Sequence, residues 1–219
     1  MRCSECLPID FFDLTNLTIM AVELWFPVPF MLTEADPAVR EPTLAKVRSY
    51  LDSAAGRAAV THAPTESVNT SFFKPEKSVF DDANLAELRA FVLASAADFI
   101  KGMGLEPIPL KVERAWINVF APGAQEEMHS HDGSLLSGTY YVEAPKDCGS
   151  INFPDPVGAR RAHRAFTKTG GSGYLLAPAM SFEPQPGRLL MFESWVQHSI
   201  GCNKSDQVRI SIAFNFGRA

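Results

Sequence analysis

The spacing of apolar residues predicts a helix near residues 83–103. An apolar stripe at helical spacing runs through this segment, formed by Leu85, Leu88, Val92, Ala96, Phe99 and Met103. Asp81 or Asp82 is suited to cap its start, and Gly102 and Gly104 are suited to end it. A single apolar stripe must be covered, so we expect this helix to pack against a sheet.

Weaker patterns precede this helix. Residues 21–31 alternate enough to predict a strand, and residues 36–55 are compatible with a first helix. Asp36 is a suitable N-cap and Pro37 suits the first helical position, while Gly56 is a plausible stop. Pro42 disfavours the first turns, so the well-formed part could begin only after it. Residues 57–80 are polar and without periodicity, so we predict a surface loop.

From Leu110 onward the pattern becomes that of short strands separated by Gly and Pro turns. Residues 111–120 alternate, with Val112, Arg114, Trp116, Asn118 and Phe120 on one side. Further strands are predicted near residues 127–131, 138–143, 150–153, 173–176, 181–184, 189–193 and 207–216. Many short strands with no long helix between them favour a sandwich or barrel over a parallel α/β sheet.

Length and charge narrow the possible classes. The chain has 219 residues, which fits one domain with a sizeable core. We expect an N-terminal part over residues 1–108 and a strand-rich core over residues 109–219 that share one interior. Hydrophobic residues make up 46% and charged residues 21%, with a formal net charge of −5. Nothing in this balance indicates a nucleic-acid or anionic-membrane surface.

Cysteine usage and the N-terminal region indicate a cytoplasmic protein. Cys3-x-x-Cys6 resembles half of a zinc site or a redox pair, but no second such pair follows. Cys148 and Cys202 are interpreted as reduced, small apolar residues. The apolar run over residues 17–32 is interrupted by one Glu and two Pro residues, so it is not a clean membrane span.

The candidate chemistry lies in a histidine pair and a distant third histidine. Two His at positions i and i+2 of a strand point to the same face, as His129 and His131 do in the predicted strand. His198, supplied by another strand, could complete one side of a metal's coordination sphere and leave positions open. Arg209 and Ser211 share a face in the last strand and form a fork suited to a carboxylate.

Other interpretations of these residues stay open. The two His could merely cap a strand end, and Asp132 could replace His131 as a ligand if the strand ends at His131. Strand geometry favours His131, because Asp132 should point away from the His129 face. If Arg209 binds no ligand, we expect it to form an internal ion pair. The basic run over residues 160–164 is either a solvated loop or a lid over an anionic substrate.

The order of these motifs resembles the Fe(II)- and 2-oxoglutarate-dependent oxygenases, in particular a bacterial group of unassigned members. The matching motifs are Trp116-Ile117-Asn118, Pro122-Gly123, His129-Ser130-His131, Ser137-Gly138-Thr139-Tyr140-Tyr141, Phe192-Glu193-Ser194-Trp195-Val196-Gln197-His198 and Arg209-Ile210-Ser211-Ile212-Ala213-Phe214-Asn215. The resemblance covers about half of the chain. It implies a mainly β fold, a double-stranded β-helix (jelly roll), with the N-terminal helices packed on one sheet.

The resemblance also implies a function and roles for individual residues. Fe(II) is expected on His129, His131 and His198, and 2-oxoglutarate on Arg209 and Ser211. Further hydrogen-bond donors are expected to be Asn118 and either Tyr140 or Tyr141, of which we choose Tyr140. One departure is that His131 stands where most of the superfamily has a carboxylate.

The implied reaction consumes dioxygen, converts 2-oxoglutarate to succinate and CO2, and hydroxylates an unidentified substrate. Two alternatives remain. One is a cupin-type metal enzyme that does not use 2-oxoglutarate, and the other is a non-enzymatic metal- or ligand-binding jelly roll. A homodimer is compatible with this fold.

Overall fold

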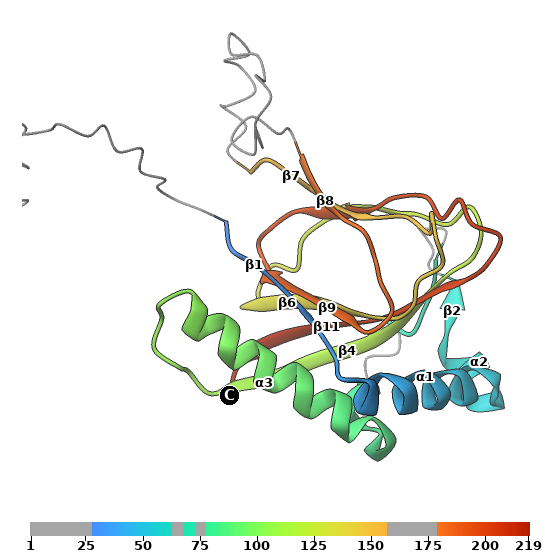
Figure 1. Cartoon of the computed structure of the whole chain (residues 1–219), viewed down its shortest axis with the longest axis horizontal. Helices are drawn as coiled ribbons and strands as arrows, with labels where there is room; N and C mark the ends of the chain where they lie inside the picture. Colours follow the sequence, from blue (N-terminus) through green and yellow to red (C-terminus); the bar gives the residue numbers. More distant parts are fainter. Residues whose placement is uncertain (1–27, 63–67, 73–77, 157–178) are drawn as a thin grey trace, which may run out of the picture.

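Two antiparallel β-sheets face each other in the computed structural model, which describes residues 28–62, 68–72, 78–156 and 179–219 (Figure 1). The larger sheet has seven strands, in the order β1 (Phe30–Glu34), β9 (Arg188–Glu193), β6 (Leu136–Glu143), β11 (Arg209–Arg218), β4 (Leu110–Phe120), β3 (Asn69–Thr70) and β2 (Thr61–His62). The smaller sheet has four, in the order β5 (Glu126–His129), β10 (His198–Ile200), β7 (Ile151–Pro154) and β8 (Ala179–Phe182).

The two faces of the larger sheet differ because β11 alternates in side-chain character. Ile210, Ile212 and Phe214 belong to the apolar core on the helix side of this sheet. Arg209 and Ser211 lie on the opposite face, which looks toward the smaller sheet and lines a pocket. Period-two alternation in one strand thus separates a purely structural face from a face that carries polar side chains.

Helices α1 (Pro37–Asp52) and α3 (Ala86–Gly102) cover the outer face of the larger sheet (Figure 1). The Asp36 carboxylate accepts a hydrogen bond of 2.8 Å from the backbone N–H of Ala38, which caps the start of α1. Leu88, Val92 and Ala96 of α3 are completely buried against the sheet. The predicted apolar stripe is therefore the surface that joins the helices to the β core.

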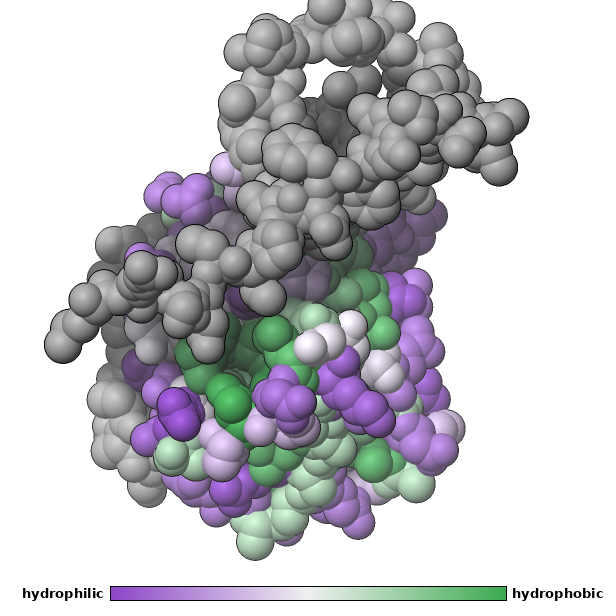
Figure 2. Space-filling view, turned by 90° about the vertical axis from the view of Figure 1, so that its left-hand side faces the viewer, coloured by the Kyte–Doolittle hydropathy of each residue, from purple (hydrophilic) through white to green (hydrophobic). Residues whose placement is uncertain are grey.

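A second apolar cluster lies between the two sheets. Its buried members include Phe120, Phe153, Phe192, Val196 and Ile200, and Phe30 and Phe182 pack against them. The rings meet mostly edge to face, with 4.7 Å between the centroids of Phe30 and Phe153. Seen from the left-hand side of Figure 1, apolar residues gather in the middle of the molecular face and hydrophilic residues border them (Figure 2).

The mainly β fold with flanking helices is confirmed, and several local predictions need correction. Helix α1 begins at Pro37 despite Pro42, and it ends at Asp52 rather than at Gly56. The predicted loop over residues 57–80 contains the end of α2 (Ala54–Ala59) and the short strands β2 and β3. Residues 21–27, the predicted strand 173–176, Cys3, Cys6 and the basic run 160–164 lie outside the described residues.

Two corrections concern the histidine region. Strand β5 ends at His129, two residues earlier than predicted, and His198 begins a short strand, β10, that the periodicity did not predict. Three residues are too few to produce a recognisable alternation. None of the helices in the described part of the chain has the length and apolar character that a membrane crossing requires.

Candidate metal centre

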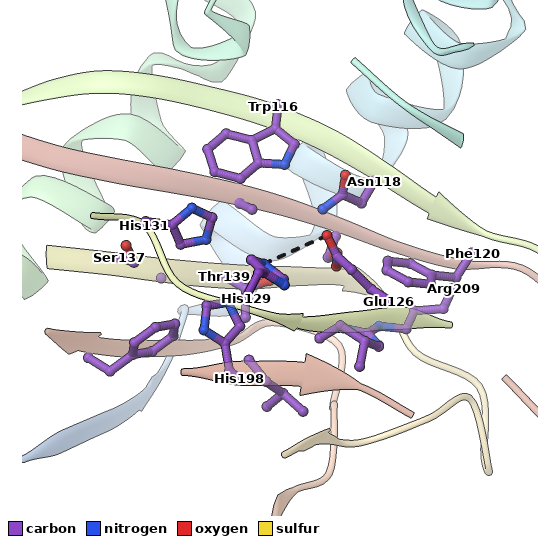
Figure 3. A pocket seen from close by; sticks show the side chains of 16 residues that line it. Trp116, Asn118, Phe120, Glu126, His129, His131, Ser137, Thr139, His198 and Arg209 are labelled. Atoms are coloured by element: carbon purple, nitrogen blue, oxygen red, sulfur yellow. Dashed lines mark ion pairs between the residues drawn. The ribbon is translucent and has the colours of Figure 1, made fainter. Parts of the chain in front are cut away.

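Three histidines meet in the pocket between the two sheets (Figure 3). One ring nitrogen from each of His129, His131 and His198 lies within 4.8 Å of the others. The ring centroids of His129 and His198 are 4.3 Å apart, and that of His131 is 5.1 Å from the first and 5.2 Å from the second. Nitrogen atoms at these separations can converge on a single ion.

Strand pairing explains how residues so far apart in sequence come together. His129 of β5 is the direct register partner of His198 of β10. His131 lies beyond the end of β5, but its backbone N–H donates a hydrogen bond of 2.9 Å to the carbonyl oxygen of Ser194. That bond ties the segment after β5 to the turn before β10, so His131 stays with the other two rings although the strand has ended.

Backbone carbonyl groups orient two of the rings. Nδ1 of His129 lies 2.8 Å from the carbonyl oxygen of Glu127, and Nδ1 of His198 lies 3.0 Å from that of Val196. A carbonyl oxygen can only accept, so Nδ1 must carry the proton in both rings. Nε2 of each ring is thereby left with a free lone pair, which is the form that binds a metal.

Burial keeps His131 and His198 uncharged. Desolvation, followed by the proximity of His129, lowers the pKa of His131 to about 4. The same two causes, in the same order, lower the pKa of His198 to about 3, while the hydrogen bond to Val196 acts in the opposite direction. At neutral pH both side chains are therefore neutral and available as ligands.

The structure separates His131 from its competitor Asp132. The Asp132 carboxylate accepts a hydrogen bond of 3.1 Å from the hydroxyl of Ser130, and it is not part of the group of converging ligand atoms. Asp132 thus lies outside the converging group, although β5, whose alternation was expected to turn it away, already ends at His129.

A buried guanidinium lies in the same pocket. Arg209 is 1% exposed, its Nη1 donates to the carbonyl oxygen of Gly149 at 3.2 Å, and its Nε has no hydrogen-bond partner. Its Cζ lies 4.7 Å from the ring centroid of Phe120 and 5.2 Å from that of Tyr141. No carboxylate of the described residues forms an ion pair with it. A buried charge with an unused donor is costly unless a ligand supplies the partner.

The other predicted cosubstrate residues divide between the two faces of the larger sheet. Asn118 and Ser211 are register partners across β4 and β11, and both line the pocket. Tyr140 does not reach it, because its ring belongs to the core on the helix side. The choice of Tyr140 is therefore corrected. Tyr141 pairs with Ser211, shares the pocket face, and has a buried hydroxyl without a partner.

Some pocket residues were not singled out from the sequence. Glu126 lines the pocket, and its Oε1 lies 3.8 Å from Nε2 of His129. Behind His131, the hydroxyl of Ser137 lies 2.8 Å from that of Ser194 and donates to Asn215 at 2.9 Å. The signal in the sequence that could have found Glu126 is its place as an acidic residue three positions before His129.

The residues fit a divalent metal together with a carboxylate ligand. Three neutral imidazoles on one side suit a mid-first-row divalent ion and leave other coordination positions open, as catalytic sites do. In the same pocket, the unpartnered Nε of Arg209 suits a carboxylate. Fold and site together fit a jelly-roll protein that holds a metal ion beside an organic acid.

The sequence of the β core is similar to a known family. Residues 114–215 match the model of a family described as "Putative 2OG-Fe(II) oxygenase". The matched segment begins in β4, ends in β11 and contains all three histidines and Arg209. This part of the chain, a little under half of its length, is therefore similar to the Fe(II)- and 2-oxoglutarate-dependent oxygenases. No curated protein matches the chain.

Solved structures share the fold at low sequence identity. The alpha-ketoglutarate-dependent epimerase SnoN from nogalamycin biosynthesis has a TM-score of 0.61 and 16% identity, covering 88% of this chain and 79% of SnoN. A Pseudomonas putida prolyl-4-hydroxylase has a TM-score of 0.54 and 19% identity, covering 88% and 94%. HygX from Streptomyces hygroscopicus, with nickel and 2-oxoglutarate bound, has a TM-score of 0.53 and 12% identity, covering 88% and 84%.

Proposed function

We propose that this protein is an Fe(II)- and 2-oxoglutarate-dependent dioxygenase that hydroxylates a small molecule, with His129, His131 and His198 as the metal ligands. The observation that carries the proposal is the pairing of two features in one pocket. One is the three-histidine cluster, and the other is a buried Arg209 with an unused donor. Together with the match of the core to the oxygenase family, this favours a cosubstrate that carries a carboxylate.

In this proposal Arg209 and Ser211 hold the carboxylate of 2-oxoglutarate that lies away from the metal. Arg209 supplies a planar pair of donors, Ser211 adds a hydroxyl on the same face, and Asn118 lines the same wall. Aromatic rings fix the guanidinium from two sides, so it loses little freedom on binding. Pre-positioned donors of this kind place the other end of the cosubstrate toward the three imidazoles.

The protein side chains supply orientation and a dry environment. The rings of Phe192 and Phe153 pack against His198 with centroids 4.8 and 5.7 Å away, which limits the access of water from that side. When bound, Fe(II) and 2-oxoglutarate supply the oxidising chemistry, in which dioxygen is consumed, succinate and CO2 form, and a C–H bond of the substrate becomes hydroxylated.

The substrate class is proposed from the shape of the site and from the structural neighbours. One SnoN structure contains nogalamycin RO, and a HygX structure contains hygromycin B. Both are small molecules bound by proteins with this fold. We propose a small organic substrate for this chain as well, reached from the imidazole end of the pocket, because Arg209 closes the other end in a buried position.

A second candidate follows from the third imidazole. His131 in place of a carboxylate gives an all-nitrogen set, and a cupin-type metal enzyme that does not use 2-oxoglutarate could work with such a set. Its activity would be insensitive to Arg209.

An anaerobic titration of the Fe(II)-loaded protein with 2-oxoglutarate separates the two candidates. We expect a visible charge-transfer band that saturates in the wild type and weakens in Arg209→Met. Iron binding without any band would contradict the proposed function and favour the cupin-type candidate. Loss of iron binding in His131→Ala, with unchanged thermal unfolding of the metal-free protein, would support His131 as a ligand.

A further inference from the structure

Glu126 places a negative charge beside the histidine cluster. Its Oε1 lies 3.8 Å from Nε2 of His129, the contact drawn as a dashed line in Figure 3. The Glu126 side chain is 17% exposed, so most of its surface is removed from water. Because Nε2 is the His129 nitrogen left free by the hydrogen bond to Glu127, the carboxylate stands next to the place that a bound ion occupies.

An irregularity in strand pairing brings Glu126 to this position. In a regular strand, residues three apart face opposite sides, so Glu126 and His129 would not share a face. The register between β5 and β10 shifts, however, because Ile200 pairs with Glu126 while His198 pairs with His129. Glu127 and Met128 between them are both exposed. The extra residue on β5 is a bulge that turns both Glu126 and His129 into the pocket.

The position of Glu126 matters for the sum of charges in the pocket. Among the described residues that line the pocket, Glu126 is the only acidic residue and Arg209 is the only Lys or Arg. The charges of a divalent ion and a dicarboxylate are equal and opposite, and so are the charges of Glu126 and Arg209. With a carboxylate ligand in place of His131 and Glu126 still present, the loaded site would instead carry an extra negative charge.

We propose that Glu126 is the charge-compensating residue of the metal centre, which strengthens binding of the divalent ion and weakens binding of the anionic cosubstrate. This inference rests on the proposed function in its cosubstrate part, while its metal part needs only the three-histidine site. The carboxylate attracts the ion and repels the incoming 2-oxoglutarate, so its removal must change the two affinities in opposite directions.

The first arm of the test uses Mn(II) alone. We expect Glu126→Gln to weaken Mn(II) binding about tenfold in calorimetric titrations, because a unit charge about 5 Å from a divalent ion retains an appreciable attraction even in a strongly screening medium. Glu126→Asp, which keeps the charge, should lie closer to the wild type. Glu127→Gln is the matched control, because its exposed side chain belongs to the adjacent residue and the substitution leaves its carbonyl group intact.

The second arm measures 2-oxoglutarate at saturating Fe(II) under anaerobic conditions. We expect Glu126→Gln to bind 2-oxoglutarate several-fold more tightly than the wild type. A purely structural role for Glu126 would weaken both affinities, and that result would overturn the inference, as would unchanged Mn(II) binding. Failure of the proposed function is a different result, because the wild type would then bind Mn(II) without binding 2-oxoglutarate, while the Mn(II) arm would still decide the role of Glu126.

Discussion

The two sheets contribute different kinds of side chain to the pocket. In the larger sheet, strands β6, β11 and β4 are eight to eleven residues long. Its inner face carries Arg209 and Ser211, two residues apart on β11, and Asn118, the register partner of Ser211. The smaller sheet has strands of three or four residues, and it carries His129 and His198 next to a register shift. The sheet with the longer strands thus provides the surface proposed for an organic anion, and the sheet with the short strands provides two of the three proposed metal ligands.

The difference follows from what each ligand needs. A carboxylate is met by donors on one flat surface, which regular alternation supplies at every second residue. A metal ion needs donors that converge from several directions, so the chain must bend, and a bulge and a short strand provide that bend. The helices stabilise only the larger sheet, whose outer face is entirely apolar in its central strand.

The largest effect is expected when one of the proposed metal ligands is removed. His198→Ala should weaken Mn(II) binding by more than about 100-fold, because even the loss of a residue that only supports a ligand costs 10- to 100-fold. Calorimetric titration measures the affinity. Thermal unfolding with chelator present serves as the control, since His198 is buried among aromatic rings and its loss also leaves a cavity. Wild-type affinity in this variant would remove His198 from the ligand set.

The next largest effect is expected at Arg209, the residue proposed to bind the carboxylate of 2-oxoglutarate. Arg209→Met keeps the buried volume and should lower 2-oxoglutarate affinity about 100-fold, because it removes charge-assisted hydrogen bonds, while Mn(II) binding stays within about twofold. Without cosubstrate, the same variant should be more stable by about 1 kcal/mol, since a buried charge with an unpartnered Nε is replaced by an apolar chain. Urea unfolding measures the second effect, and a destabilised variant would indicate that Arg209 already has a compensating partner.

A third prediction uses pH. The folded-state pKa values of His131 and His198, about 4 and about 3, lie below the ordinary value of 6.5, so the unfolded chain binds more protons. Stability of the metal-free protein is therefore complete above pH 6.5 and falls on acidification, with a slope of at most about 1.4 kcal/mol per pH unit for each His. Urea unfolding at pH 7, 6 and 5 with chelator measures it. His198→Gln should show a smaller slope, and an equal slope would contradict the assignment.

The smallest effect distinguishes the two faces of the larger sheet. Tyr140 and Tyr141 are neighbours, and both hydroxyls are buried without a partner. Burial raises the pKa of both, that of Tyr140 to about 12, so both remain protonated donors. Tyr141→Phe should lower 2-oxoglutarate affinity about threefold, because it removes a buried donor hydroxyl on the side of the sheet that carries Arg209, whereas Tyr140→Phe should leave it unchanged. Equal effects of the two variants would remove the distinction between the faces.

The regular parts of the molecule could be predicted from the sequence, because periodicity records which face is buried. The stripe from Leu88 to Phe99 predicted α3, and the alternation around Trp116 and Asn118 predicted β4 and its pocket face. Adjacent tyrosines cannot be assigned to faces without the exact register, since a shift of one residue exchanges them. That is why Tyr140 was chosen although Tyr141 shares the face of Ser211.

The irregular parts were not predictable for a related reason. The bulge that turns Glu126 inward leaves no periodic trace in a strand of four residues, and β10 is shorter still. The grouping of the three histidines was anticipated from motif order rather than from periodicity. Its geometry depends on the hydrogen bond between His131 and Ser194, which involves only backbone atoms and so has no signature in residue types.

The hydrogen bonds that orient His129 and His198 affect which neighbouring residues can be substituted during evolution. Both rings are held by main-chain oxygens two residues upstream, at Glu127 and Val196. Every amino acid provides such an oxygen, so the tautomers do not depend on which side chains stand at these two positions. Val196 is completely buried in the core between the sheets, whereas Glu127 is exposed, so position 127 is the one that can vary while the metal centre is inherited intact.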